Sequence, residues 1–221
     1  MKETRIFAAP VEVRGESEGV ATIAGYASVF DEPYEIAGQF TESVDPRAFN
    51  RTLKNSANDL AVVWSHDADR VLGTVASDTA RFATDDHGLR YEADLDLADP
   101  DGMSAWRKIS TGKVRQSSFS FEVVKDKWED RGDELPHRTL KEVRLWEASP
   151  VLWAANPAAD VDVKRAVASY AEYRGVEVDA DSIEQVREAT TPDSATDPVS
   201  DATQDSEPKR VRPVIVKGLN G

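Results

Sequence analysis

The chain has 221 residues, a formal net charge of −14 at pH 7 and no cysteine, which excludes a disulfide framework, a thiolate nucleophile and a cysteine-based zinc site. Its three histidines are far apart, and no apolar run approaches the roughly 20 residues that cross a bilayer. An acidic chain also repels phosphate backbones. We therefore expect one globular domain with no metal, no cofactor, no membrane span and no nucleic-acid partner.

β-Strand patterns fill most of the chain as far as residue 147. Runs rich in β-branched and aromatic residues cover residues 5–13, 19–30, 60–65, 71–76, 80–84, 89–97, 119–128 and 139–147. Polar stretches at residues 15–18, 85–88 and 129–133 predict turns between neighbouring runs. Short connections of this kind favour antiparallel pairing.

Three helices are expected between and after these strands. Asp45-Pro46 and Asp99-Pro100 each place an N-cap residue before a proline at the first helical position, and they predict helices that run to Asn55 and toward Gly112. An apolar stripe predicts a third helix over residues 161–174. Many short strands with a few flanking helices indicate an α+β domain built round an antiparallel, barrel-like sheet.

The acidic excess gathers near the C-terminus. Residues 175–208 contain ten acidic residues against one basic residue, Arg187. Such a stretch, interrupted by prolines, cannot bury enough apolar surface to offset the entropy of ordering. We expect a folded domain over residues 1–175 and an acidic tail over residues 176–221, disordered at about 190–210, with a short basic and apolar end at 209–217.

Three segments carry candidate catalytic groups, in the order His66, Ser118 and Glu147. A serine hydroxyl is a poor nucleophile unless an imidazole takes its proton and a carboxylate orients that imidazole. Together the three segments supply a nucleophile, a base and an orienting acid. The residues alone also leave Asp67 and Asp69, which follow His66, as alternative orienting acids.

The same segments resemble the prohead (capsid maturation) proteases of tailed bacteriophages, which are similar to the herpesvirus assemblins. The resemblance covers about residues 20–160. It is carried in order by four motifs: Gly25-Tyr26-Ala27-Ser28-Val29-Phe30 with Asp45-Pro46-Arg47-Ala48-Phe49, His66-Asp67 with Leu72-Gly73, Ser118-Phe119-Ser120-Phe121, and Glu147-Ala148-Ser149 with Asn156-Pro157-Ala158.

The resemblance implies a herpesvirus-protease-like fold and a serine endopeptidase with a Ser118, His66 and Glu147 triad. The chain departs from the family pattern at Ser120, where the family has glycine, so Ser117 and Ser120 remain alternative nucleophiles.

Two further roles are less specific. Herpesvirus relatives use a second histidine in place of the acid, which makes His137 a lower-ranked alternative to Glu147. Backbone N–H groups near Ser117 and Ser118, with Arg115 as a cationic helper, are the expected donors to an oxyanion.

The implied function is cleavage of the scaffold region of the phage major capsid protein, and of the chain itself, inside the assembling procapsid in the host cytoplasm. Self-association as a homodimer or a higher assembly is expected by the same resemblance. The alternative is a non-catalytic scaffold or capsid-assembly protein that retains the protease fold. A β-barrel binding module with no viral role would leave the four ordered motifs unexplained.

Overall fold

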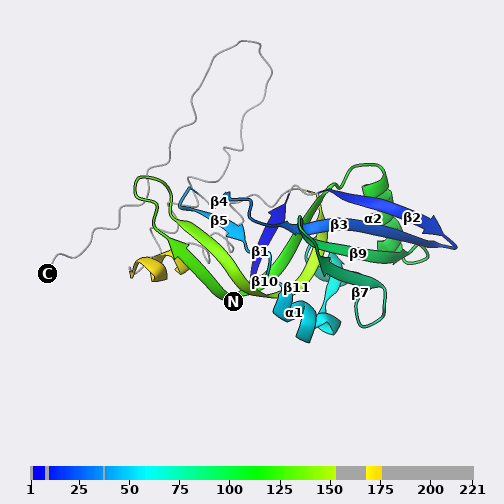
Figure 1. The fold of residues 1–221 in the computed structure, drawn as a ribbon. Coiled ribbons are helices and arrows are strands. Elements are labelled where there is room, and N and C mark those ends of the chain that lie inside the picture. Colours follow the sequence, from blue (N-terminus) through cyan, green and yellow to red (C-terminus); the bar gives the residue numbers. More distant parts are fainter. Residues whose placement is uncertain (1, 8–9, 37, 153–167, 176–221) are drawn as a thin grey trace, which may run out of the picture.

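The computed structural model describes residues 2–7, 10–36, 38–152 and 168–175, which form two β-sheets with short helices beside them (Figure 1). The larger sheet has seven strands: β1 (Lys2–Phe7), β4 (Tyr34–Ile36), β5 (Phe40–Val44), β6 (Ala61–Trp64), β7 (Asp67–Thr74), β10 (Gln116–Glu129) and β11 (His137–Val151). The smaller sheet has four: β2 (Val11–Ser17), β3 (Val20–Val29), β8 (Ala80–Thr84) and β9 (Gly88–Asp96). The helices are α1 (Asn50–Asn55), the 3-10 turn η1 (Ala57–Asp59), α2 (Pro100–Ser110) and residues 168–174.

The long β10–β11 hairpin organises the larger sheet. β10 pairs antiparallel with β1 on one edge and with β11 on the other. The second edge of β11 is shared by two short strands, because β5 pairs with residues 137–140 and β6 pairs with residues 147–148. Strands β1, β6, β10 and β11 therefore lie side by side at one place, although they come from distant parts of the sequence.

The barrel-like antiparallel core predicted from the sequence is not what the described strands form. They make two separate sheets that are not closed into a barrel. In addition, β5 and β6 both run parallel to β11. Both parallel pairings are possible because β11 is long. Its 15 residues leave an edge on which two short strands can pair one after the other, both in the same direction as β11. The predicted mixed α+β class is confirmed.

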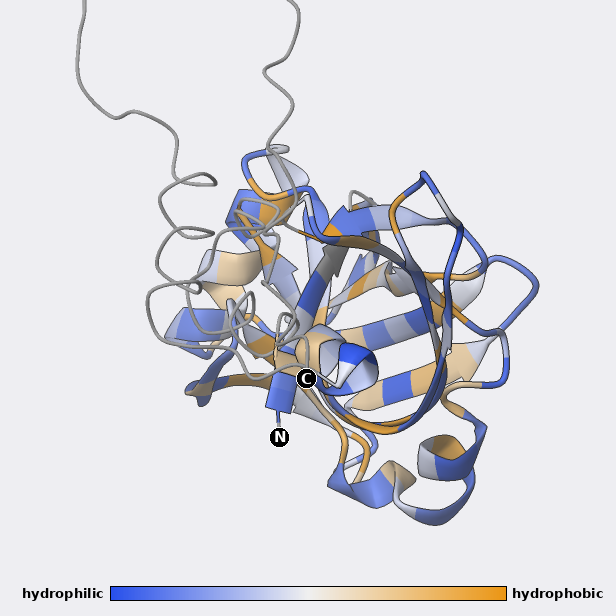
Figure 2. Ribbon diagram, turned by 90° about the vertical axis from the view of Figure 1, so that its left-hand side faces the viewer, coloured by the Kyte–Doolittle hydropathy of each residue, from blue (hydrophilic) through white to orange (hydrophobic). Residues whose placement is uncertain are grey.

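Both faces of β10 are buried near its start. Phe119 stacks on Phe121 with ring centroids 4.8 Å apart and meets Phe49 edge-on at 5.5 Å. Ser118 and Ser120 alternate with these rings on the opposite face, and both are fully buried. The fold therefore covers the serine face of this strand as well as its aromatic face. Hydrophilic positions lie on the connections between strands and alternate with hydrophobic positions along the strands (Figure 2).

Local signals predicted several elements well. Strand 80–84 and helix α2 begin where expected, and Asp99 caps α2 by accepting a hydrogen bond from the Asp101 N–H at 3.0 Å. The helix after Asp45-Pro46 begins later than predicted, at Asn50. Asp45 instead forms a turn, in which its side chain accepts from the Arg47 N–H at 2.9 Å.

Other elements differ from the prediction. The run over residues 5–13 is split into β1 and β2, which belong to different sheets. The short strands β4 and β5 were not predicted. Of the predicted helix over 161–174, residues 168–174 are helical and 161–167 lie outside the described residues, as does the predicted acidic tail over 176–221. The domain boundary at residue 175 stays a prediction. No described helix is long and apolar enough to cross a membrane.

Candidate active site

His66 lies at the tip of a tight hairpin between β6 and β7. Ser65 and His66 form its two-residue turn with φ angles of 52° and 64°. This left-handed geometry suits asparagine and glycine, so two other residues adopt it at a cost of about 1–3 kcal/mol each. Two hydrogen bonds fasten the turn to β11, from the Ser65 N–H to the Pro150 carbonyl at 3.3 Å and from the His66 N–H to Ser149 Oγ at 3.1 Å.

Glu147, on β11, is a hydrogen-bond partner of the His66 imidazole. His66 Nδ1 lies 2.7 Å from Glu147 Oε1. A β-bulge falls beside Glu147: Ser120 pairs with Glu147 and Phe121 with Leu145, which leaves Trp146 without a partner in the register. Bulges bend a strand and re-aim the neighbouring side chains. The bulge and the β6 pairing together place the Glu147 carboxylate beside His66 Nδ1.

The pKa of Glu147 indicates a charged carboxylate. Burial raises this pKa, but hydrogen bonds with His66, Ser120 and Ser149 and the charge of His66 outweigh burial and lower it below its ordinary value. An ionised carboxylate only accepts hydrogen bonds, so His66 Nδ1 must carry the proton between the two groups. His66 Nε2 is then the basic nitrogen. It is buried and has no hydrogen-bond partner among the described residues.

The structure brings Ser120, rather than Ser118, into contact with this pair. Ser120 Oγ lies 3.3 Å from His66 Nδ1 and 3.4 Å from Thr4 Oγ1. Ser118 Oγ donates a hydrogen bond to the Arg5 carbonyl on β1 at 2.9 Å. Both serines are on the same face of β10, one alternation apart. Ser118 therefore lies opposite Ser149 in the β10–β11 register, and its hydroxyl bonds to β1.

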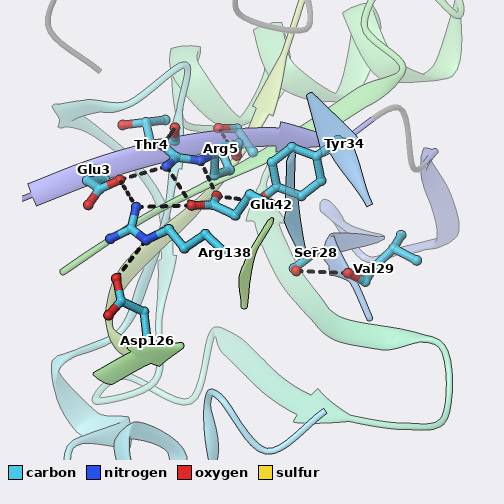
Figure 3. A network of polar contacts seen from close by, with 10 residues as sticks. Glu3, Thr4, Arg5, Ser28, Val29, Tyr34, Glu42, Asp126 and Arg138 are labelled. Atoms are coloured by element: carbon cyan, nitrogen blue, oxygen red, sulfur yellow. Dashed lines mark hydrogen bonds and ion pairs between the residues drawn. The ribbon is translucent and has the colours of Figure 1, made fainter. Parts of the chain in front are cut away.

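A buried network of charges holds β1 in this place (Figure 3). Arg5 Nε donates to Glu42 Oε1 at 2.6 Å, and Arg138 Nη1 donates to Glu42 Oε2 at 3.1 Å. Arg5 also pairs with Glu3, and Arg138 with Asp126. Burial raises the pKa of Glu42, but the two guanidinium groups outweigh it and lower that pKa below the ordinary value. Strands β1, β5, β10 and β11 are joined by this network.

The other candidates are not in contact with His66 or Glu147. Asp67 and Asp69 are both exposed, and the Asp67 carboxylate accepts a hydrogen bond from the Asp69 N–H at 3.0 Å. Neither of these two acids orients the imidazole. Arg115 is exposed. Ser117 is buried on the other face of β10, where its hydroxyl lies 3.0 Å from Tyr91 OH.

His137, the lower-ranked alternative to Glu147, is part of a separate buried cluster. Its Nδ1 lies 2.8 Å from Thr41 Oγ1 and its Nε2 lies 3.0 Å from Ser43 Oγ. Burial lowers the pKa of His137, which favours the neutral ring. His137 begins β11, while Glu147 is near the far end of the same strand. The residue therefore stabilises the β5–β11 contact and has no contact with His66.

Ser149 is the residue at this site to which the sequence pattern assigned no role. It is fully buried, accepts from the His66 N–H, and donates to Glu147 Oε2 at 2.6 Å. The Glu147-Ala148-Ser149 spacing could have predicted this contact, because strand alternation puts Glu147 and Ser149 on one face.

Among the described residues no group of three or more His, Asp or Glu side chains is placed to hold a metal ion.

Comparison with models of protein families shows the family to which the chain belongs. The model of the caudovirus prohead serine proteases matches residues 9–173, well over half of the chain. The chain belongs to this family. No curated protein and no solved structure matches the chain. The family prediction is confirmed, and with it a serine protease of bacteriophage capsid maturation. The residues matched by the family model include His66, Ser118, Ser120 and Glu147, and they begin after the end of β1.

Proposed function

We propose that this prohead protease cleaves the scaffold region of the phage major capsid protein with Ser118 as nucleophile, His66 as general base and Glu147 as the orienting acid. The observation that carries the proposal is the state of His66. Its Nδ1 is engaged by a buried carboxylate, and its Nε2 is free of partners among the described residues. This is the arrangement in which an imidazole accepts a proton from a serine.

We choose Ser118 over Ser120 as the nucleophile because the two nitrogens of the His66 ring differ in their protonation. Ser120 lies on the Nδ1 side, where the proton is already shared with Glu147. A nitrogen that carries a proton cannot remove another one, so Ser120 is not placed to be activated. Its hydroxyl instead adds a hydrogen bond to Glu147. Ser118 is the remaining serine on that face of β10 at the family's nucleophile position.

Activation of Ser118 requires its hydroxyl to leave the Arg5 carbonyl. A change of χ1 between staggered rotamers moves Oγ without moving the backbone. From the second rotamer Oγ attacks the scissile carbonyl while Nε2 takes the hydroxyl proton. The same proton then passes to the departing amine. Nε2 next takes a proton from a water molecule that attacks the acyl-enzyme, and returns it to Ser118 Oγ as the acyl group leaves. Backbone N–H groups near Ser117 and Ser118 are the proposed oxyanion donors.

The place of action follows from the family role in capsid maturation. We place the enzyme inside the assembling procapsid, where the major capsid protein and further copies of this chain are its neighbours. Cleavage of the chain by itself and assembly as a dimer or larger species belong to the same proposal. The fold likeness to herpesvirus proteases, the protease domain over residues 1–175 and the flexible tail over 176–221 remain predictions.

A fluorophosphonate probe tests the proposed nucleophile, because such reagents attach covalently to activated serine hydroxyls. The intact wild-type chain should gain one adduct, and peptide mapping should place that adduct on Ser118. His66→Ala should prevent labelling. An adduct on Ser120 or Ser149 would overturn the assignment of the nucleophile, whereas no adduct at any serine would argue against catalysis.

One observation favours the non-catalytic alternative. Ser118 is fully buried and hydrogen-bonded to Arg5 rather than to His66. A capsid-assembly protein that retains the fold would keep this closed arrangement permanently. The two functions are distinguished by coexpression with the capsid precursor, since an assembly protein would be incorporated into procapsids while the masses of both chains stay unchanged.

A further inference from the structure

One hydroxyl connects the two halves of the catalytic pair. Ser149 Oγ donates to Glu147 Oε2 at 2.6 Å and accepts from the His66 backbone N–H at 3.1 Å. A hydroxyl has one proton and two lone pairs, so both contacts can be made at once. Ser149 is fully buried, and neither contact is readily replaced by solvent.

The first contact fixes the carboxylate. Glu147 uses Oε1 to accept from His66 Nδ1 and Oε2 to accept from Ser149 Oγ. With both oxygens held, the carboxylate plane cannot turn away from the imidazole. Hydrogen bonds to an ionised group are about twice as strong as those between neutral groups, so the restraint on Glu147 is substantial.

The second contact fixes the turn that carries the imidazole. Ser65 and His66 both have left-handed backbone angles, which persist only where surrounding contacts hold them. The His66 N–H would be without its partner if the Ser149 hydroxyl were removed. The turn would then relax, and the ring would move relative to Glu147.

We propose that Ser149 is a positioning residue that locks the His66 turn and the Glu147 carboxylate into one rigid unit. The inference rests on the proposed function, in which His66 and Glu147 act on Ser118. Ser149 is not itself placed as the nucleophile, because its proton is donated to a carboxylate and it has no contact with His66 Nε2 in the described structure. Its effect is exerted through the other two residues.

The test is Ser149→Ala in the full chain, measured as the rate of fluorophosphonate labelling against pH. We expect a loss of roughly 10- to 100-fold, which is the value of one hydrogen bond to a charged group. The acid limb of the profile should also move to higher pH, because Glu147 loses one of the donors that favour its ionised form. Ser149→Thr, which keeps the hydroxyl, should restore most of the rate.

Ser43→Ala is the matched control. Ser43 is also a buried strand serine that contacts a histidine, since its Oγ lies 3.0 Å from His137 Nε2. Removing that hydroxyl should lower the thermal midpoint about as much as Ser149→Ala while leaving the labelling rate and its pH profile unchanged. If Ser149→Ala behaves like Ser43→Ala in all three measurements, Ser149 is only a structural serine and the proposal is wrong.

A measurement without catalysis separates this inference from the proposed function. In the nitrogen-15 spectrum of labelled histidine, wild-type His66 should be the Nδ1–H tautomer with a low-field proton, whether or not the chain cleaves anything. Ser149→Ala should broaden or shift that signal, while Ser43→Ala should not. An unchanged His66 signal in Ser149→Ala overturns the inference even if the wild type is an active protease. An inactive wild type with an intact, Ser149-dependent signal overturns the proposed function alone.

Discussion

His66 Nδ1 and Glu147 Oε1 are 2.7 Å apart, although 81 positions separate the two residues in the sequence. The contact exists because β6, which ends just before the His66 turn, pairs in parallel with β11 at Glu147. The arrangement of the sheet thus places a base against an acid. Ser120 and Ser149 contact the same pair from β10 and β11.

Replacing His66 by alanine should reduce cleavage of the capsid precursor nearly to the level of a serine knockout, because members of a triad act as a unit. Glu147→Gln should be less severe, since it keeps the shape and a hydrogen bond but loses the charge that stabilises imidazolium. Initial rates measured by gel densitometry would order the variants. Asp67→Asn is the matched control and should be silent; if it is the damaging change and Glu147→Gln is silent, Glu147 is not the orienting acid.

Ser120→Gly restores the residue that the family has at this position and should leave the enzyme active. Glu147 would lose one of its hydrogen-bond donors, so its pKa should rise and the acid limb of the rate profile should move to higher pH. The rate at pH 8 should change less than about tenfold, the value of a hydrogen bond of roughly 1.4 kcal/mol. Complete loss of activity in Ser120→Gly at every pH would instead identify Ser120 as the nucleophile.

Glu42→Gln should destabilise the fold by about 3–5 kcal/mol, because it leaves Arg5 and Arg138 buried without their shared anion. Urea denaturation followed by fluorescence would measure the loss. The pKa of Glu42 is lowered in the folded state, so its contribution is present above the unfolded pKa and is lost as the pH falls through the folded pKa. The difference between wild type and variant should therefore shrink on acidification. A difference that stays constant down to pH 2 would contradict this role.

The sequence predicted what depends on local chemistry. Asp99 caps α2 as expected, and strand β8 covers residues 80–84 as its β-rich run predicted. The His66 turn was not predictable, because Ser-His is no turn signal and its left-handed angles are held by hydrogen bonds to β11, a strand distant in the sequence. The same holds for the role of Ser149. Its two contacts depend on the parallel pairing of β6 with β11, which no local sequence pattern predicts.

Removing residues 190–221 should leave the protease domain folded and active on the capsid precursor, because the acidic, proline-interrupted composition of this segment cannot support a packed core. The shortened chain should keep a cooperative thermal transition within a few degrees of the full chain. Its incorporation into procapsids should decrease if the basic end at 209–217 is a docking signal. Loss of the cooperative transition would mean that the domain extends beyond residue 175.

The most direct test of the central claim is the intact mass, over time, of this chain coexpressed with the major capsid protein precursor. We compare the wild type with Ser118→Ala and Ser120→Ala. Ser118 is buried and hydrogen-bonded to Arg5, so its removal should cost about 1 kcal/mol and leave the fold intact. The account predicts that both proteins stay at full length in Ser118→Ala while Ser120→Ala still processes them. Processing by Ser118→Ala at the wild-type rate would contradict it.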